Sequence, residues 1–455
     1  MSEHGNPGGT WYEATQVAAP ERPQLTFDFD VDVCVVGAGL AGLTAAREVA
    51  RRGWSVAVLE ANRVAWAASG RNTGFVLPGF QQDVDGMIER IGLDHTKRLW
   101  ALSERGLAYV RSAIAENNMP GVEPADGWLH VSKTDDSGGE SRAYVERLRW
   151  IGGEVEAWPA ERVREVLPNP AYFSAVHYPT AFHIHPLNYA LGLAAAAEAA
   201  GARIFEHTPA MSIDPTGVRK RIITPHARVR APHVVLAGNV HLGALLPELA
   251  ATLVPVNTFV MVSEPIGPRL REIIRYRGAV SDTERADNHY RVVGDAEGGE
   301  RLQWSGGMRV WEANPLRFAR MLQRSIRRAF PDLGTVEIAH LWRGTLGRSV
   351  HRMPQIGELE PGQWVASGFG GHGLNTTALA GELIARGIVE KDDTWRLFAP
   401  YELVWAGGAA GRALAQGLYW KRRAGDNLAQ AMAQRRARSR QRKAARRTAR
   451  AQAAE

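Results

Sequence analysis

The stretch VDVCVVGAGLAG, residues 31–42, decides the fold of this chain. Its first half is rich in β-branched residues and predicts a buried strand, and the residues from Leu40 to Arg52 predict a helix. A second β-prone run, residues 54–59, predicts another strand that is closed by Glu60. Strand, helix and strand fit within about 30 residues, as a βαβ unit requires.

Three glycines within this stretch have the spacing of a dinucleotide-binding turn. Gly37 permits a tight turn, Gly39 lets the backbone approach a diphosphate, and Gly42 allows close packing of helix and strand. The helix then presents unpaired N–H groups and the positive end of its dipole to the diphosphate. Glu60, 18 residues beyond Gly42, can accept hydrogen bonds from ribose hydroxyls. The expected contacts are Gly37, Ala38, Gly39, Leu40, Ala41, Gly42, Glu60 and Ala61.

Two further glycine-rich segments favour FAD, a choice that the βαβ motif alone leaves open between FAD and NAD. Residues 67–74, AASGRNTG, follow the βαβ unit directly, and residues 368–376, GFGGHGLNT, run into a predicted helix over 377–387. The start of that helix can stabilise negative charge on a reduced flavin. We expect flavin contacts from Ala68, Ser69, Gly70, Arg71, Asn72, Thr73 and Gly74, and from Gly371, His372, Gly373, Leu374, Asn375 and Thr376.

These motifs, with HPLNYALGL (residues 185–193), residues 234–238 and RMPQIG (residues 352–357), resemble the D-amino-acid oxidase superfamily. The likeness is greatest to its glycine-oxidase-like branch, which includes gamma-glutamylputrescine oxidoreductases, and it runs from about residue 28 to about residue 400. The resemblance implies FAD as the cofactor, an adenine contact from the backbone of Ala210, and further cofactor contacts from Ala237 and Gly238. We expect FAD to be bound noncovalently unless a histidine is used for attachment, because Cys34, inside the first strand, cannot reach the edge of the flavin ring.

The resemblance also implies an α/β protein, of the α+β two-domain kind, in which a discontinuous Rossmann-like FAD-binding domain accompanies a smaller antiparallel-sheet substrate domain. Strand-like runs between residues 253 and 310 are consistent with that sheet. The expected division is a flexible N-terminal arm at 1–27, the FAD-binding domain at 28–120, 182–252 and 340–400, the substrate domain at 121–181 and 253–339, and a helical basic C-terminal extension at 401–455.

Composition is ordinary for a globular protein of 455 residues, with 45% hydrophobic and 23% charged residues. The net charge of +7 is misleading, because residues 431–455 contribute +8 and leave about −1 for the rest. We therefore expect no specific nucleic acid partner. The basic tail predicts either a solvated segment or weak contact with an anionic membrane. The single cysteine, Cys34, excludes an internal disulfide.

No run of 18 apolar residues occurs, and the first 25 residues lack a basic start followed by an apolar core. We expect a cytoplasmic protein, with a location at the inner membrane face as the alternative.

Four side chains are candidates for catalysis. Hydride transfer to flavin N5 requires a neutral amine and an aligned C–H bond, so positioning is expected to dominate. Arg343, Arg348 and Arg352 are candidates for holding a substrate carboxylate, which arginine binds bidentately. His372, within the second glycine-rich loop, is the candidate for orienting the amine. We expect no metal.

The leading hypothesis is an FAD-dependent oxidoreductase that oxidises the C–N bond of a primary or secondary amine or an amino acid, a gamma-glutamylputrescine-like amine being favoured. A D-amino-acid dehydrogenase that passes electrons to a membrane acceptor is the alternative enzyme. A flavin-binding partner subunit without turnover is the alternative of another class. The electron acceptor, dioxygen or a quinone or partner protein, stays open. A lysine near the flavin assists dioxygen reduction in the sarcosine-oxidase branch of the superfamily, and no lysine occurs here between Lys220 and Lys391.

Overall fold

A parallel sheet holds the βαβ unit at its centre. The computed structural model describes residues 9–135, 138–282, 288–294 and 299–425. The sheet has the strand order β18-β19-β12-β2-β3-β8. Only the edge strand β18 is antiparallel to its neighbour. The strands are β2 (Val33–Val36), β3 (Val56–Leu59), β8 (Arg203–Phe205), β12 (His233–Leu236), β18 (Gln355–Glu360) and β19 (Gln363–Ser367).

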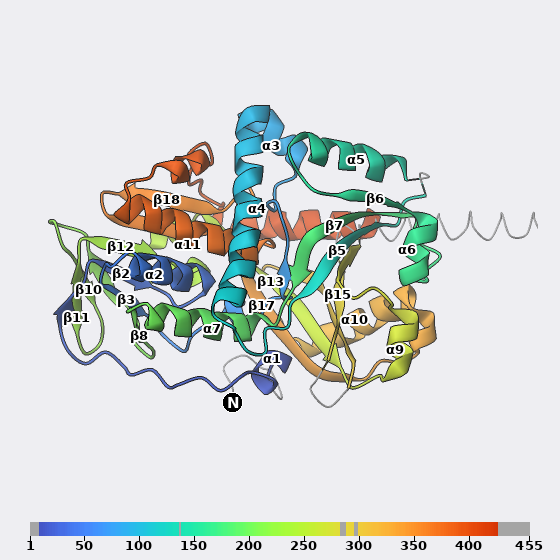
Figure 1. Ribbon diagram of the computed structural model, residues 1–455, viewed down its shortest axis with the longest axis horizontal. Helices are drawn as coiled ribbons and strands as arrows, with labels where there is room; N and C mark the ends of the chain where they lie inside the picture. Colours follow the sequence, from blue (N-terminus) through green and yellow to red (C-terminus); the bar gives the residue numbers. More distant parts are fainter. Residues whose placement is uncertain (1–8, 136–137, 283–287, 295–298, 426–455) are drawn as a thin grey trace, which may run out of the picture.

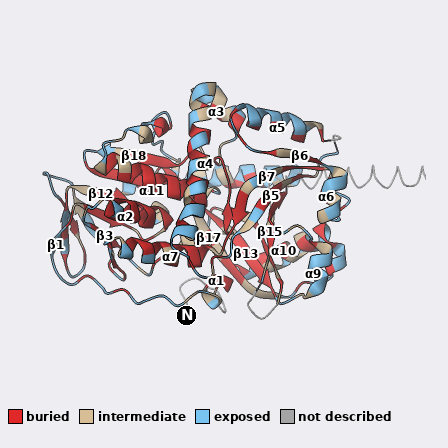
Figure 2. Ribbon diagram, in the orientation of Figure 1, coloured by how far each residue is buried: buried red, intermediate tan, exposed pale blue. Residues whose placement is uncertain are grey.

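Helices pack against this sheet as close neighbours of one another (Figure 1). They are α2 (Leu40–Arg51), α4 (Leu93–Glu116), α7 (Pro186–Ala199) and α11 (Gly373–Val389). A Cβ added at Gly381 of α11 would lie 2.5 Å from Thr44 Cβ of α2, so this glycine sets the closeness of the two helices. Figure 2 shows α2 and α11 almost entirely buried. The middle of α11 is thereby held close to the first turns of α2.

A nine-stranded sheet forms the second lobe, on the right of Figure 1. Its strand order is β17-β13-β16-β15-β14-β5-β7-β4, and β6 pairs with β7. All pairs are antiparallel except β14 with β5. The strands are β4 (Phe75–Val76), β5 (Ala125–Ser132), β6 (Glu156–Pro159), β7 (Ser174–His183), β13 (Leu253–Ser263), β14 (Ala279–Asp282), β15 (His289–Val293), β16 (Arg301–Arg309) and β17 (Ile338–Ser349).

Smaller elements complete the two lobes. A four-stranded sheet of order β1-β11-β10-β9 lies beside the parallel sheet. Its strands are β1 (Phe29–Asp30), β9 (Ser212–Asp214), β10 (Lys220–Ile223) and β11 (Arg228–Ala231). The short helices are α3 (Val84–Ile91), α5 (Gly139–Trp150), α6 (Ala160–Val166), α8 (Pro247–Ala250), α9 (Pro268–Ile273) and α10 (Leu316–Ala329), with 3-10 turns η1 (Ala68–Gly70), η2 (Asn239–Leu242), η3 (Pro331–Leu333) and η4 (Thr394–Phe398).

The N-terminal arm expected over 1–27 contains an ordered helix, although residues 16–27 form no helix or strand. Helix α1 (Trp11–Ala14) begins with a capping box between Thr10 and Glu13, and Tyr12 is fully buried. The Tyr12 hydroxyl donates to Gln303 Oε1 at 2.9 Å. The glycines and prolines of this segment predicted a loop. Its ordered structure depends instead on contacts with residues nearly 300 positions away. Residues 1–8 lie outside the described part.

The predicted two-domain division agrees with the parallel sheet but not with every strand of the larger one. All six strands of the parallel sheet fall within the segments 28–120, 182–252 and 340–400. Strand β17, however, pairs with β13 along its length, so residues 340–349 belong to the nine-stranded sheet. Strand β4 likewise pairs with β7. We propose that the domain boundary lies at the end of β17.

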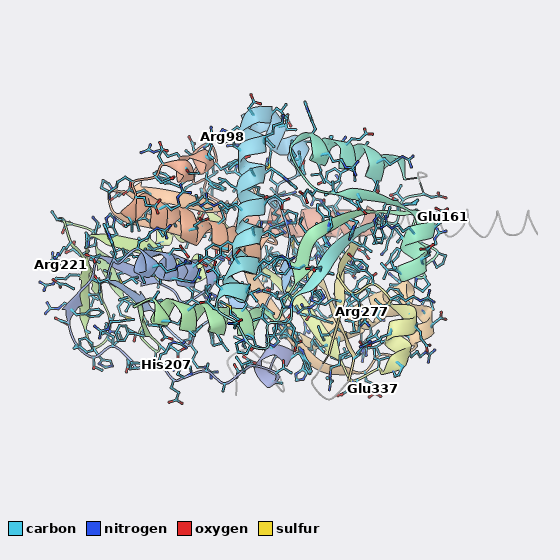
Figure 3. The ribbon with its side chains drawn as sticks, viewed as in Figure 1. Arg98, Glu161, His207, Arg221, Arg277 and Glu337 are labelled. Atoms are coloured by element: carbon cyan, nitrogen blue, oxygen red, sulfur yellow. The ribbon has the colours of Figure 1, made fainter. Side chains whose placement is uncertain are left out.

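The C-terminal extension contains a helix over residues 408–425, and the basic tail 431–455 lies outside the described residues. Charged side chains such as Arg221 and Glu337 lie at the periphery in Figure 3 and are exposed. Cys34 is buried in β2, and burial raises the pKa of its thiol to about 12. In the part of the chain that the structure describes, no helix combines the length and apolar character needed to cross a bilayer.

Candidate active site

The turn between β2 and α2 has the geometry that its glycines predict. Gly37 has φ +107°, a left-handed conformation that glycine adopts readily. A Cβ added at Gly42 would lie 2.0 Å from the backbone oxygen of Gly37, and one at Gly39 would lie 3.0 Å from Ser69 Oγ. Ser69 Oγ also accepts a hydrogen bond from Leu40 N–H at 3.0 Å. The turn therefore presents bare backbone to whatever lies before the helix.

Glu60 stands at the end of β3 and is tied to this turn. Its carboxylate accepts hydrogen bonds from Ala38 N–H at 2.8 Å and from Asn62 N–H at 2.9 Å. Burial, the largest influence, raises the pKa of this carboxyl above its usual value. Each carboxylate oxygen retains acceptor capacity beyond these bonds. Glu60 is thus fixed where it can accept further hydrogen bonds from a polar ligand.

The second glycine-rich segment meets the first around one cavity of about 1060 Å³. His372 is the N-cap residue of α11, with no side-chain capping bond, so the first N–H groups of that helix have no side-chain cap. Gly370, with φ +57°, donates through its N–H to Gly347 O at 3.0 Å, which ties the loop to β17. The cavity therefore touches segments separated by more than 300 residues.

The cavity includes many of the predicted cofactor residues but not all. Those that line it are Gly37, Gly39, Leu40, Ala41, Glu60, Ala61, Ala68, Ser69, Asn72, Thr73, Ala210, Ala237, Gly238, Gly371, His372, Gly373 and Leu374. Those that do not are Ala38, Gly42, Gly70, Arg71, Gly74, Asn375 and Thr376.

Several of the residues outside the cavity support its walls. Asn375 is buried and donates to Gly79 O at 3.1 Å, and Arg71 contacts Glu13 at 3.1 Å. Gly42 permits the turn rather than lining the cavity.

The three predicted arginines do not all lie at the same site. Arg348 and Arg352 line the cavity, whereas Arg343 does not. Arg343 instead forms an ion pair with Glu312 at 3.2 Å. Strand β17 borders the cavity only from Thr345 to Ser349, and Arg343 lies before that part of the strand. The structure therefore leaves Arg343 out of the site.

Arg348 is held by a glutamine. The side-chain amide of Gln81, oriented with its oxygen toward the guanidinium, accepts from Arg348 Nη2 at 2.7 Å and from Nε at 3.2 Å. Arg348 Nη1 lies 3.7 Å from Met308 Sδ. These contacts fix the guanidinium plane at the cavity wall. Arg352, in the turn after β17, has φ +61°.

The end of the cavity that lies in the nine-stranded sheet contains three histidines. His130, His289 and His372 line it, and His130 and His289 escaped the sequence reasoning. Trp128 Nε1 donates to Ser281 Oγ at 2.9 Å, and that oxygen lies 2.7 Å from His289 Nδ1. His289 and the buried Tyr290 are neighbours on β15, so their side chains point to opposite faces of the sheet. The sequence alone does not tell which of the two faces lines a cavity.

Two of these histidines are held in the neutral form. Burial lowers the pKa of His372 to about 4, and the nearby His289 and His130 lower it further. Burial likewise lowers the pKa of His289 to about 4. His372 Nδ1 is buried and has no hydrogen-bond partner in the structure. In the described residues, no group of His, Cys, Asp and Glu has a metal-binding arrangement.

A buried arginine supports the loop that precedes β4. Arg291 donates through Nη1 to Ile184 O at 2.7 Å and lies 2.8 Å from His183 Nδ1. Gln303, which accepts from Arg291, donates to Thr73 O at 2.9 Å. Nothing in the local sequence around Arg291 indicated this role.

The residues present fit FAD. Backbone N–H groups at the start of α2 match a diphosphate, Glu60 matches a ribose, and the start of α11 matches the pyrimidine side of a flavin. A Cβ at Gly37 would lie 3.0 Å from Ala237 C and O, so glycine keeps this cradle open. His372 lines the same cavity.

Comparison with known proteins agrees with this geometry. Residues 32–386 match the family DAO, described as FAD dependent oxidoreductase. Gamma-glutamylputrescine oxidoreductase of Escherichia coli (strain K12) is 31% identical over 401 residues, which covers 87% of this chain and 92% of that protein. Glycine oxidase of Geobacillus kaustophilus (strain HTA426) is 23% identical, covering 82% and 96%.

Solved structures share the fold. The crystal structure of glycine oxidase from Geobacillus kaustophilus superposes with a TM-score of 0.68 at 21% identity, covering 82% of this chain and 98% of that one. L-proline dehydrogenase from P. horikoshii gives a TM-score of 0.66 at 20% identity, covering 84% and 100%.

Proposed function

The chain belongs to the DAO family of FAD-dependent oxidoreductases, and on that premise we propose that it oxidises the C–N bond of an amine or amino acid, with a gamma-glutamylputrescine-like amine as the favoured substrate. FAD is the cofactor. The supporting observation is one cavity that runs from the βαβ turn, past the start of α11, to the chamber of Trp128, His130 and His289. The finer choice of substrate is supported by the relative that is 31% identical.

The chemistry that FAD supplies when bound is acceptance of a hydride from the carbon that bears the nitrogen. The protein's contribution is to place that carbon and to bind the amine in its neutral form. His289 and His372, being neutral, each offer a lone pair that can accept a hydrogen bond from an amine N–H. A charged imidazolium in the same place would repel an ammonium ion.

Arg348 is proposed to hold a carbonyl or carboxylate oxygen of the substrate. Its guanidinium is already oriented by Gln81, so little side-chain freedom is lost on binding. Arg352 is proposed as a second cation of the same wall, and Arg343 is not part of this proposal. Apolar side chains, among them Phe75, Leu77 and Trp128, exclude water from the chamber.

An anaerobic substrate screen tests the proposal. FAD-loaded enzyme is mixed with gamma-glutamylputrescine, putrescine, glycine, L-proline and a set of D-amino acids, and the visible flavin absorbance is followed. We expect gamma-glutamylputrescine to bleach the flavin fastest. Bleaching by D-amino acids alone would favour the D-amino-acid dehydrogenase alternative. A flavin that no compound bleaches would favour a binding subunit without turnover.

Reoxidation of the same reduced enzyme identifies the electron acceptor. Among the described residues that line the cavity there is no lysine, so dioxygen reduction has no ammonium group to assist it. The bleached enzyme is exposed to dioxygen in one sample and to a soluble quinone in another. Rapid return of colour with formation of hydrogen peroxide identifies an oxidase, and return only with the quinone identifies a dehydrogenase.

A further inference from the structure

The helix over residues 408–425, which follows the segment that matches the family, forms one side of the cavity. It is the red helix that continues into the grey trace in Figure 1. Its cavity-lining residues are Gly411, Leu414, Ala415, Leu418, Tyr419 and Arg422. Most of these recur at intervals of three or four, which places them on one face of the helix. Arg422 is the charged residue of that face.

Specific contacts seat this helix against the rest of the protein. Gln416 is fully buried, and its Oε1 accepts from Val310 N–H at 3.1 Å. Ala406 N–H, just before the helix, donates to Ala251 O at 2.8 Å. These contacts anchor the helix just before its start and at its middle, and Arg423, next to Arg422, contacts Met321 Sδ at 3.0 Å.

The charges that line the cavity are unbalanced. Among the described residues, its arginines are Arg348, Arg352 and Arg422, and its one carboxylate is Glu60. Glu60 lies at the ribose end and is bonded to Ala38 and Asn62. Neither Arg352 nor Arg422 forms an ion pair with a carboxylate within the described part of the chain. An anionic group of a ligand would relieve this excess of positive charge.

We propose that Arg422 binds a carboxylate of the substrate that is remote from the oxidised amine, so that the helix 408–425 determines substrate specificity. The inference rests on the proposed amine oxidation and names the class of amine: one that carries an anionic group at its far end. The diphosphate of FAD is not the expected anion, because the start of α2 accommodates it. Guanidinium–carboxylate hydrogen bonds are charge-assisted and discriminate well against an uncharged analogue.

The first test measures binding without turnover. N-butylglutaramate carries the remote carboxylate but no oxidisable amine, and N-butylpentanamide lacks both. Their binding to the FAD-loaded enzyme is measured by calorimetry for wild type, Arg422→Gln and Arg412→Gln. Arg412, exposed on the same helix and outside the cavity, is the matched control. We expect wild type and Arg412→Gln to prefer the carboxylate by on the order of tenfold, and Arg422→Gln to lose that preference.

The second test uses turnover of N-glutarylputrescine and N-pentanoylputrescine. Arg422→Gln should raise KM for the glutaryl compound on the order of tenfold, leave kcat nearly unchanged, and leave the pentanoyl compound unaffected. If wild type oxidises neither compound, calorimetry alone decides the role of Arg422, and the anaerobic substrate screen decides the proposed function.

The inference is overturned if wild type shows no preference for the carboxylate or if Arg422→Gln retains it. Equal loss in Arg412→Gln, or loss of FAD affinity in Arg422→Gln measured by flavin fluorescence, would also overturn it.

Discussion

Arg291 shows how one buried side chain organises a wall of the site. Its guanidinium is 3% exposed and contacts Ile184 O, His183 Nδ1 and the Tyr12 hydroxyl. Burial lowers its pKa from the usual value, and Tyr12 partly opposes that effect. A Cβ added at Gly74 would lie 2.7 Å from Arg291 Nη2, so the loop and the guanidinium fit closely. The loop before β4 therefore depends on this residue.

Replacing Arg291 with methionine should destabilise the holoenzyme by about 3 kcal/mol, because three buried polar partners lose a hydrogen bond. Urea unfolding measures the loss, and Arg320→Met, at an exposed position of α10, serves as the control. A change of less than about 0.5 kcal/mol, the range of ordinary surface substitutions, would contradict a structural role for the guanidinium.

Buried neutral histidines predict loss of stability in acid. Burial lowers the pKa of His183 to about 3 and that of His185, His289 and His372 to about 4, from a usual value of 6.5. The unfolded chain therefore binds protons first as pH falls, so stability is full above about pH 6.5 and declines toward pH 4.

The urea midpoint should accordingly be constant from about pH 8 to 7 and fall between about pH 6.5 and 4.5. His183→Gln should flatten this dependence, whereas His226→Gln, at an exposed position, should not alter it. A midpoint as high at about pH 5 as at pH 7.5 would show that these imidazoles are not held neutral by the fold.

Single residues of the site could be predicted only where a motif marked them. His372 was found because it lies in a glycine-rich loop, whereas His130 and His289 lie on ordinary strands. Arg343 and Arg348 could not be separated without the position of β17, because only the end of that strand borders the cavity. The role of Arg291 could not be predicted from the sequence, because its partner Tyr12 is 279 positions away.

At the scale of elements, the βαβ unit was fully readable. Its signal is local: an apolar strand, a glycine turn, a helix and an acid within about 30 residues. The helix α11 was also predicted, although it begins at Gly373, four residues before the predicted start at residue 377. The ordered structure around α1 was not predicted, because it depends on tertiary contacts and not on local helix propensity.

Gly42 provides the sharpest test of this unit. In Gly42→Ala the added carbon would meet Gly37 O at 2.0 Å, and backbone must move to accommodate it. Overpacking of this kind is worth about 1–3 kcal/mol, so FAD affinity should fall by roughly tenfold to a hundredfold. Fluorescence titration of the apoprotein with FAD measures it.

Gly417→Ala is the matched control, because a Cβ there meets nothing within 4 Å. Undiminished FAD affinity in Gly42→Ala would mean that the turn is not the diphosphate site.

At the scale of the whole molecule, the cavity is shared by both large sheets. Gly37 and Ala237 follow strands of the parallel sheet, whereas Thr258 and Ser305 belong to the nine-stranded sheet, and all four line it. The sequence indicated two domains and two converging glycine-rich loops, but the helix 408–425 as a third contributor was not foreseen. Its role depends on where the chain returns in space, which no local pattern encodes.

FAD should therefore stabilise both lobes together. Binding to the folded state alone adds about 2.7 kcal/mol at a free concentration 100 times Kd, so the apoprotein should unfold at a clearly lower temperature than the holoenzyme. Calorimetry should give one transition that moves up as FAD is added. Two transitions, only one of which responds to FAD, would show that the cofactor contacts a single lobe.

The proposed function depends most on removal of a hydride from the carbon next to the nitrogen, at the place where the two glycine-rich loops meet. Anaerobic stopped-flow mixing of FAD-loaded enzyme with gamma-glutamylputrescine, protiated or deuterated at the carbon that bears the terminal amino group of putrescine, measures this directly. The account predicts that the flavin absorbance bleaches and that deuterium slows the bleaching. Equal rates with both isotopes when substrate is saturating, or a bound flavin that stays coloured with every amine supplied, would contradict it.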